Sequence, residues 1–297
     1  DLACVEVSAT AAHRWVQERG KHVKLDASRA EGRPLLVDAT RIHAGPNPRG
    51  CNLNLGLSLA GRRWLGGRAG MRIDPVCLGV DETWAKTAGA LARCRPGRVV
   101  YDGDPDVVEW VEGTFAEVPK QRCSWHLVHE LNRHLWEDGL KQAQARTWRN
   151  QLRQILYQPE YPLPQRRAAL HVLIQQLRDH GLTNVAHYLE DAAPRVFAYR
   201  EEPDGMFFDQ QRQEPLAISS TSPVERQMRE INRRTDVGAR WQPTGVTNLL
   251  RLDLIRRFDT QQWNSLWGLQ RVHLDDRLTF NLQMSVSVGP PSNVNTT

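Results

Sequence analysis

The chain has 297 residues, of which 40% are hydrophobic and 25% are charged, and its formal net charge is +5. This composition is typical of a globular protein with one or two domains and a real core. The mild basic excess is compatible with a polyanionic partner without establishing one. No apolar run approaches the roughly 18 residues of a membrane span, which argues against a membrane-spanning protein.

The cysteines are odd in number and have no spacing typical of a disulfide framework: Cys4, Cys51, Cys77, Cys94 and Cys123. We therefore expect reduced thiols in a cytoplasmic protein. No signal peptide is recognisable at the start of the sequence, which agrees with that location.

The first predicted element is a short helix over residues 8–19, with Ser8 as its N-cap and Gly20 at its end. Such a helix fits the second half of a helix-turn-helix whose first half precedes residue 1. An ordinary surface helix that leads into the fold fits at least as well, and the sequence does not decide between them.

Residues 34–126 alternate between strand and helix patterns. We predict strands at 34–38, 51–60, 75–80 and 98–101, and helices at 82–94 and 106–115. Apolar runs and period-2 alternation favour the strands, and the acids Asp81 and Glu82 favour a helix start. A further short strand is expected to end in the C-x-x-H sequence of Cys123 and His126. Together these elements indicate an α/β layer architecture.

From about residue 127 to residue 200 the apolar residues recur with the period of a helix, which predicts an all-helical block of three or four helices. Between residues 141 and 171 this block carries one acid, Glu160, and six basic residues: Lys141, Arg146, Arg149, Arg153, Arg166 and Arg167. A solvated face is the ordinary explanation of such a flank, and contact with a phosphate backbone is the functional one.

Two more helices are predicted near the end of the chain. The first covers residues 222–234, with Ser222 as N-cap and Pro223 at the first helical position. The second is an amphipathic helix at 245–258. The composition of residues 289–297 predicts a disordered tail.

Three carboxylates stand out by position: Asp38 at the end of the first strand, Asp102 at the end of the fourth, and Glu225 in the first turn of a late helix. Each also has an ordinary explanation. Asp38 and Asp102 fit turns after strands, and Glu225 fits a capping box with Ser222. Spacing alone leaves the choice open.

The order of these motifs resembles that of the mutator-type DDE transposases of prokaryotic insertion sequences. The resemblance covers about residues 33–257 and is carried by LLVDAT (35–40), VVYDGD (99–104), QRCSWH (121–126) and SPVERQMREINRRT (222–235). It implies an α/β fold with a ribonuclease H-like core, in which a mixed sheet with flanking helices is interrupted by an all-α insertion before the catalytic Glu helix.

The resemblance also implies a division of the chain. Residues 1–32 are expected to be the remnant of an N-terminal helical DNA-binding region. Residues 33–126 and 216–260 form the two parts of the catalytic core, and residues 127–215 form the insertion. Residues 261–297 form a C-terminal helix and the disordered tail.

On this resemblance Asp38, Asp102 and Glu225 are the catalytic triad and hold two Mg²⁺ or Mn²⁺ ions. DNA cleavage and joining are attacks on a phosphodiester by water or a 3′-hydroxyl, and two ions ~4 Å apart activate the nucleophile and stabilise the leaving oxygen. Mg²⁺ prefers carboxylate oxygens, phosphate and water. We expect Asp38 to bridge the ions, with Asp102 on one and Glu225 on the other. Asp104 and Asp106 are rivals of Asp102, which ends the apolar run and matches the family position.

Residues beside the triad have further predicted roles. A zinc site needs four ligands, and no second Cys/His pair lies at a telling distance in sequence, so we favour His126 as a contact to DNA or to a carboxylate. Cys123 then fits a buried small hydrophobe. Trp125 fits either the core or a platform for a splayed base. The helical series Arg226, Arg229 and Arg233 fits a solvated face or a clamp on DNA.

The leading hypothesis is a metal-dependent DNA transposase that cleaves and transfers the strands of an insertion sequence. Its expected partner is double-stranded DNA at the element ends and target, bound by a homodimer or larger assembly with a cytoplasmic, nucleoid-associated location and no membrane contact. One alternative is a catalytically idle or domesticated relative that binds DNA. Another is a different nuclease on the same core, such as a resolvase.

Overall fold

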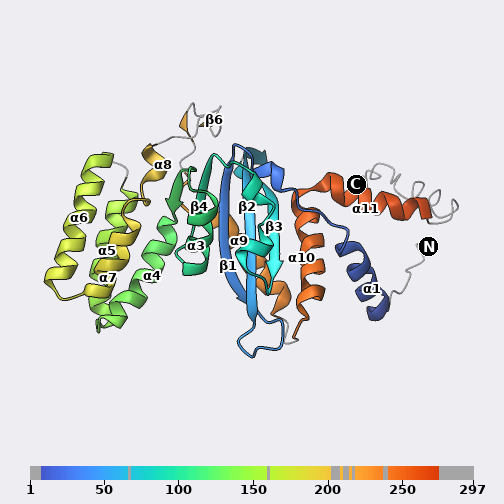
Figure 1. Cartoon of the computed structure of the whole chain (residues 1–297), viewed down its shortest axis with the longest axis horizontal. Helices are drawn as coiled ribbons and strands as arrows, with labels where there is room; N and C mark the ends of the chain where they lie inside the picture. The colour runs from blue at the N-terminus through green and yellow to red at the C-terminus, as the bar shows by residue number, and fades with distance from the viewer. Residues whose placement is uncertain are drawn as a thin grey trace, which may run out of the picture.

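The structure is a computed structural model that describes residues 8–65, 68–158, 161–201, 208–209, 214–215, 218–236 and 240–273. A central sheet separates a block of helices, α4 to α8, from a second group formed by α1, α10 and α11 (Figure 1). Within the described part of the chain, no helix is long and apolar enough to cross a bilayer. The predicted tail at 289–297 lies outside the described residues.

The sheet has five strands in the order β3-β2-β1-β4-β5. Their bounds are β1 (Pro34–Ile42), β2 (Cys51–Leu65), β3 (Arg68–Val80), β4 (Arg98–Tyr101) and β5 (Lys120–Arg122). The pairs β1/β2 and β2/β3 are antiparallel, and the pairs β1/β4 and β4/β5 are parallel. This mixed sheet with flanking helices confirms the predicted α/β class.

The helices that flank the sheet or pack beyond it follow this order in the chain: α1 (Ala9–Gly20), α2 (Trp84–Thr87), α3 (Pro105–Thr114), α9 (Ser222–Thr235), α10 (Pro243–Phe258) and α11 (Thr260–His273). Between β5 and α9 lie α4 (Ser124–Glu137), α5 (Gln142–Tyr157), α6 (Leu163–Asp179), α7 (Thr183–Ala192) and α8 (Ala198–Glu201). As predicted for the start of α1, Ser8 is its N-cap and accepts a hydrogen bond from the backbone N–H of Ala11.

The strands β1 and β4 divide their side chains between two apolar cores, because successive residues point to opposite faces of a sheet. Leu36 and Val100 pair in register and belong to the core that α9 and α10 cover. Val37 and Tyr101 also pair, and they belong to the core of the other face, which α3 covers. Residues that pair between β1 and β4 therefore point to the same face of the sheet and enter the same core.

The helical block has an apolar core of its own, built from leucines such as Leu131, Leu152 and Leu173. The guanidinium of Arg166 is part of this interior, since the residue is 0% exposed. It donates hydrogen bonds to the carbonyl oxygens of Ile155 and Leu156 at the end of α5. These carbonyls have no helical partner at a helix end, so Arg166 completes the packing of α5 on α6.

Several predicted bounds were wrong. β1 continues past Asp38 to Ile42 because it pairs with β2 along that whole length, so Asp38 lies within a strand. Residues 82–94 do not form one helix: α2 ends at Thr87, just before Gly89, a poor helix former, and only a 3₁₀ turn follows. The C-x-x-H sequence lies at the start of α4, after β5 ends at Arg122.

Candidate metal centre

Two acids lie side by side at the end of the parallel strand pair. The pairing of β1 and β4 ends at Val37 and Tyr101, so Asp38, within β1, and Asp102, directly after β4, are the next residues of the two segments. Each acid follows by two residues a side chain of the core under α9, and the pleat therefore directs both carboxylates to that face. Both are buried, Asp38 with 1% and Asp102 with 8% of its surface exposed.

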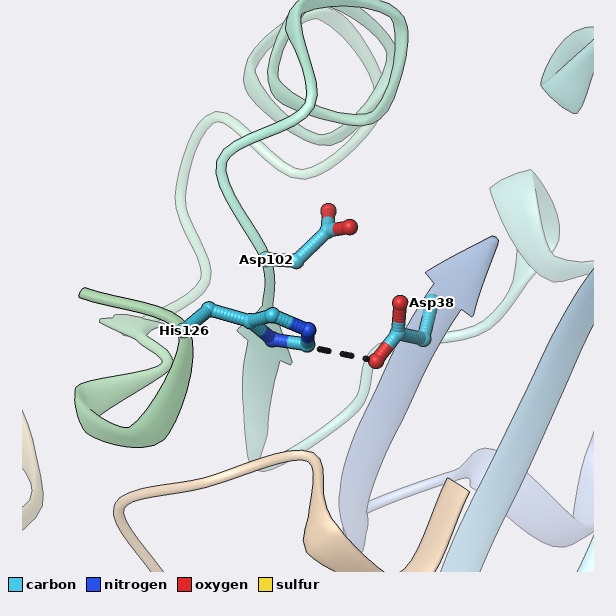
Figure 2. A group of neighbouring side chains, drawn as sticks. All are labelled: Asp38, Asp102 and His126. Carbon is cyan, nitrogen blue, oxygen red and sulfur yellow. Dashed lines mark ion pairs between the residues drawn. The ribbon is translucent and has the colours of Figure 1, made fainter. Parts of the chain in front are cut away.

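A third ligand group comes from α4. One ligand atom each of Asp38, Asp102 and His126 lies within 4.8 Å of the other two. Figure 2 shows the imidazole of His126 directed toward Asp38, with the side chain of Asp102 beside them, each on a separate element. The Nδ1 atom of His126 is 3.9 Å from Oδ2 of Asp38. A strand, the loop after a strand and a helix start thus converge on one small volume.

Only one of the two carboxylate oxygens of Asp38 accepts a hydrogen bond from the protein. Its Oδ1 atom accepts a hydrogen bond from the backbone N–H of Ala39 at 2.9 Å, whereas its buried Oδ2 atom has no hydrogen-bond partner. Burial and the neighbouring charge of Asp102 raise the pKa of Asp38 well above its usual value. Burial likewise raises the pKa of Asp102. Two adjacent buried acids with an open oxygen are the donor set that a hard divalent cation prefers.

Glu225 is connected to the acidic centre by a contact with His126. Its Oε1 atom lies 2.8 Å from Nε2 of His126, and that hydrogen bond lowers the pKa of Glu225. The predicted capping box with Ser222 is absent, because α9 is capped by Thr221 and no side-chain cap bond forms. The carboxylate of Glu225 is therefore not used as a helix cap and contacts His126 instead. It lies outside the group formed by Asp38, Asp102 and His126.

A buried polar network holds His126 in place. The hydroxyl of Thr221 lies 3.3 Å from Nδ1 of His126 and 3.4 Å from the thiol of Cys123. Burial opposes a charge on His126, but its hydrogen bonds with Cys123 and Glu225 outweigh burial and raise its pKa to about 11. His126 is thus a cation at neutral pH. Cys123 is fully buried, as expected, yet its sulfur also accepts the N–H of Thr221.

Thr221 is a residue that the sequence-based reasoning missed, because Ser222 looked like the better cap. The only sequence signal was its place before the Ser-Pro pair that opens the helix. Arg122 was missed as well. Its guanidinium donates to the carbonyl oxygen of Asp102, and a β-carbon at Gly103 would overlap it. A larger residue at 103 would therefore force this guanidinium to move away from the carbonyl oxygen of Asp102.

The remaining predicted residues lie around the centre. Asp104 is exposed and caps α3 by accepting a hydrogen bond from the backbone N–H of Asp106 at 3.0 Å. Neither Asp104 nor Asp106, the predicted alternatives to Asp102, belongs to the group of possible metal ligands. Trp125 is 41% exposed. Among the described residues, the group able to hold a metal includes His126 but not Cys123, which gives no support to the zinc interpretation.

Arg226, Arg229 and Arg233 of α9, the arginines predicted to contact DNA, are exposed. Arg233 forms an ion pair with Glu230 at 2.6 Å on the same helix, whereas Arg229 is close enough to Glu225 to lower the pKa of that acid. Arg226 lies in the same turn as Glu225. A cationic surface therefore adjoins the acidic centre on the α9 side.

Comparison with solved structures finds a protein of similar fold. A solved structure described as a Drosophila P element transposase strand transfer complex is similar over 86% of this chain and 86% of its own chain, with a TM-score of 0.51 and 11% sequence identity. At that identity the likeness is one of fold. No curated protein sequence matches the chain.

The family is given by a sequence model. The model described as Transposase, Mutator family, matches residues 98–263, which is more than half of the chain, and the protein belongs to this family. The match includes Asp102, His126 and Glu225 and begins after Asp38. The resemblance inferred from the sequence motifs is confirmed.

Proposed function

We propose that the protein is a DNA transposase that cleaves DNA strands and transfers them with the aid of divalent metal ions, as the enzyme of an insertion sequence. The observation that carries this proposal is the buried Oδ2 atom of Asp38, which accepts no hydrogen bond, beside Asp102 in a chain of the Mutator family. An unpaired buried carboxylate oxygen is costly unless a cation compensates it.

The residues present fit a pair of Mg²⁺ or Mn²⁺ ions. Asp38 would bridge them, Asp102 would bind one and Glu225 the other. When bound, the ions would activate the attacking oxygen and stabilise the leaving one. His126 supplies a positive charge between Asp38 and Glu225, which favours the ionised form of both acids and partly offsets the effect of burial on Asp38. It is also positioned to contact a DNA phosphate beside them.

We assign the sheet, α9 and α10 to a ribonuclease H-like catalytic core made of residues 33–126 and 216–260, with residues 127–215 as an all-α insertion. The separate apolar core of α4 to α7 supports this division, as does the packing of Val224 and Met228 of α9 in the sheet core. Residues 1–32 would be the remnant of a DNA-binding region, and residues 261–297 a C-terminal extension.

The proposed partner is double-stranded DNA of the element ends and target. Arg226 and Arg229 are exposed beside Glu225 and would bind phosphates, with Arg233 extending this surface. Because two element ends must be joined in one reaction, we propose a homodimer or larger assembly on DNA, in the cytoplasm with the nucleoid. Zinc at Cys123 and His126 is not part of the proposal.

The test is a strand cleavage and strand transfer assay on DNA that carries the element ends, with Mg²⁺, with Mn²⁺ and with chelator. We expect metal-dependent activity that falls by roughly a thousandfold in Asp102→Asn, equivalent to about 4 kcal/mol of transition-state stabilisation. The matched control Asp106→Asn removes an exposed acid of α3 and should keep full activity.

Three results would contradict the proposal. Activity that survives in Asp102→Asn would exclude the assigned site. DNA binding without any activity or Mg²⁺-dependent stabilisation would favour an idle or domesticated relative. Cut but never joined products would favour a nuclease such as a resolvase.

A further inference from the structure

A pocket of about 530 Å³ lies between the first turn of α4, α5 and the loop that leads into α9. It adjoins the candidate centre, because Ser124 at its wall belongs to the same helix turn as His126, and Ser222 to the same turn as Glu225. The metal-ion chemistry proposed above does not require this pocket, so its composition calls for a separate explanation.

The side chains that line the pocket are suited to binding an anion. Its lining includes Arg149, Arg153, His129 and four serines, and no acidic residue. Within the described part of the chain, neither arginine forms an ion pair, and the buried Nε atom of Arg149 has no hydrogen-bond partner. Unpaired guanidinium groups beside hydroxyls are suited to phosphate oxygens.

Two helix starts strengthen this positive potential. Ser124 is the first residue of α4 and Ser222 the first of α9, and each helix has 14 residues. The N-terminus of a helix carries a partial positive charge, so the dipoles of both helices favour an anion in the pocket.

The same pocket has an aromatic wall. The indole of Trp125 lines it and is 41% exposed. Its ring stacks on the imidazole of His129, with centroids 4.8 Å apart and planes 10° apart, and it meets the ring of His126 edge-on at 4.8 Å. An exposed indole that its neighbours hold in a fixed orientation is a platform on which a nucleic acid base can stack.

We propose that this pocket binds an unpaired nucleotide of the DNA strand beside the bond to be cut, with its phosphate at Arg149 and Arg153 and its base on Trp125. This inference rests on the proposed DNA-cleaving function and adds to it the state of the substrate. Bases in a duplex are stacked on their neighbours, and only an unpaired base offers its face to an indole.

The test measures binding without catalysis, by fluorescence anisotropy in the presence of chelator. The probes are labelled oligothymidylate and a blunt duplex. We expect Arg153→Gln to weaken oligothymidylate binding severalfold and to reduce the slope of log affinity against log salt by roughly 0.7, the value for one phosphate contact. The control Arg178→Gln removes an exposed arginine of α6 that pairs with Glu190, and should leave both quantities unchanged.

The aromatic wall is tested by Trp125→Ala, which should weaken oligothymidylate binding roughly tenfold and duplex binding much less. Trp125→Phe keeps a stacking face and should restore most of the loss. Thermal unfolding midpoints equal to that of the original protein show that each variant is folded. Equal effects of Arg153→Gln and Arg178→Gln, or an equal effect of Trp125→Ala on both probes, would overturn the inference.

This assay separates the two proposals. Asp102→Asn should bind oligothymidylate as the original protein does. Pocket-dependent binding in a protein that cleaves nothing would refute the proposed catalysis and leave the pocket supported. If the protein cleaves DNA with metal but the Arg153 and Trp125 variants bind oligothymidylate normally, the nucleotide pocket is refuted and the proposed catalysis is not.

Discussion

The Nε2 atom of His126 lies 2.8 Å from Oε1 of Glu225, and this contact joins the start of α4 to the first turn of α9. The Nδ1 atom of the same ring lies 3.9 Å from Oδ2 of Asp38. One imidazolium therefore balances two carboxylates that come from a strand and a distant helix. Its charge state decides how the acidic centre behaves in the absence of metal.

We expect His126→Gln to destabilise the metal-free protein by about 2 kcal/mol at pH 6, since a charged hydrogen bond is lost. The pKa of His126 is raised to about 11 in the folded protein, against about 6.5 in an unfolded chain. The stabilisation is therefore complete below about pH 6.5 and is lost as the pH rises toward 11. Urea unfolding at pH 6 and pH 9.5 measures the difference between the two proteins.

That difference should shrink at the higher pH. The control is His171→Gln, which replaces an exposed histidine of α6 and should change little at either pH. A cost of His126→Gln that does not vary with pH would show that the ring acts by packing and carries no charge.

A second prediction concerns Asp38→Asn in the metal-free protein. Burial and Asp102 raise the pKa of Asp38 above its unfolded value, so the folded state holds the proton more tightly. Folding stability must then fall as the pH rises from the unfolded pKa through the folded one. At pH 8 the uncharged amide of the variant avoids that cost, and we expect a melting temperature a few degrees higher.

Addition of Mg²⁺ should reverse this order. The ion should raise the melting temperature of the original protein and of the control Asp106→Asn, but not that of Asp38→Asn. Differential scanning fluorimetry with and without Mg²⁺ measures both effects. An equal Mg²⁺ response in Asp38→Asn would argue against this acid as a ligand.

A third prediction tests the contact between Arg122 and the backbone at Asp102 and Gly103. Gly103→Ala should destabilise the protein by about 2 kcal/mol, because the new methyl group would overlap the guanidinium of Arg122. In an Arg122→Ala background that overlap is gone and the same change should cost much less. A double-mutant cycle in urea gives the coupling. Additive effects would show that Gly103 is needed for another reason.

The fourth prediction concerns the helical block. Arg166→Met should leave buried carbonyls at the end of α5 without donors and destabilise the block by about 3 kcal/mol. The adjacent Arg167→Gln breaks only an exposed ion pair with Glu201 and should cost less than about 1 kcal/mol. Hydrogen exchange should localise the loss to α5 and α6. Similar protection in both variants would contradict the capping role.

Local patterns predicted much of the fold. The apolar run of β4 gave bounds of 98–101 that agree with the strand, and the cap at Ser8 agrees with the start of α1. The misses came from contacts between distant segments. β1 is extended by β2, and Arg166, counted among the basic residues of a solvated flank, is buried against α5. Sequence spacing carries no information on such partners.

The sequence predicted most of the residues of the candidate site but missed one that positions them. The motifs pointed to Asp38, Asp102, Glu225 and His126, and the structure brings these side chains together, while their roles stay predictions. The part played by Thr221 was not predicted. Its bonds to Cys123 and His126 require α9 to lie against α4, which depends on the whole fold.

The parallel register of β1 and β4 has a consequence for how this protein can decay. The spacing of Asp38 and Asp102 is fixed by backbone pairing that begins four residues before each acid, and neither side chain contributes to that pairing. A gene copy that loses one of these carboxylates would still encode a well-folded product. Selection for solubility or folding would therefore not remove such copies, and under the proposed function they would be inert but stable proteins.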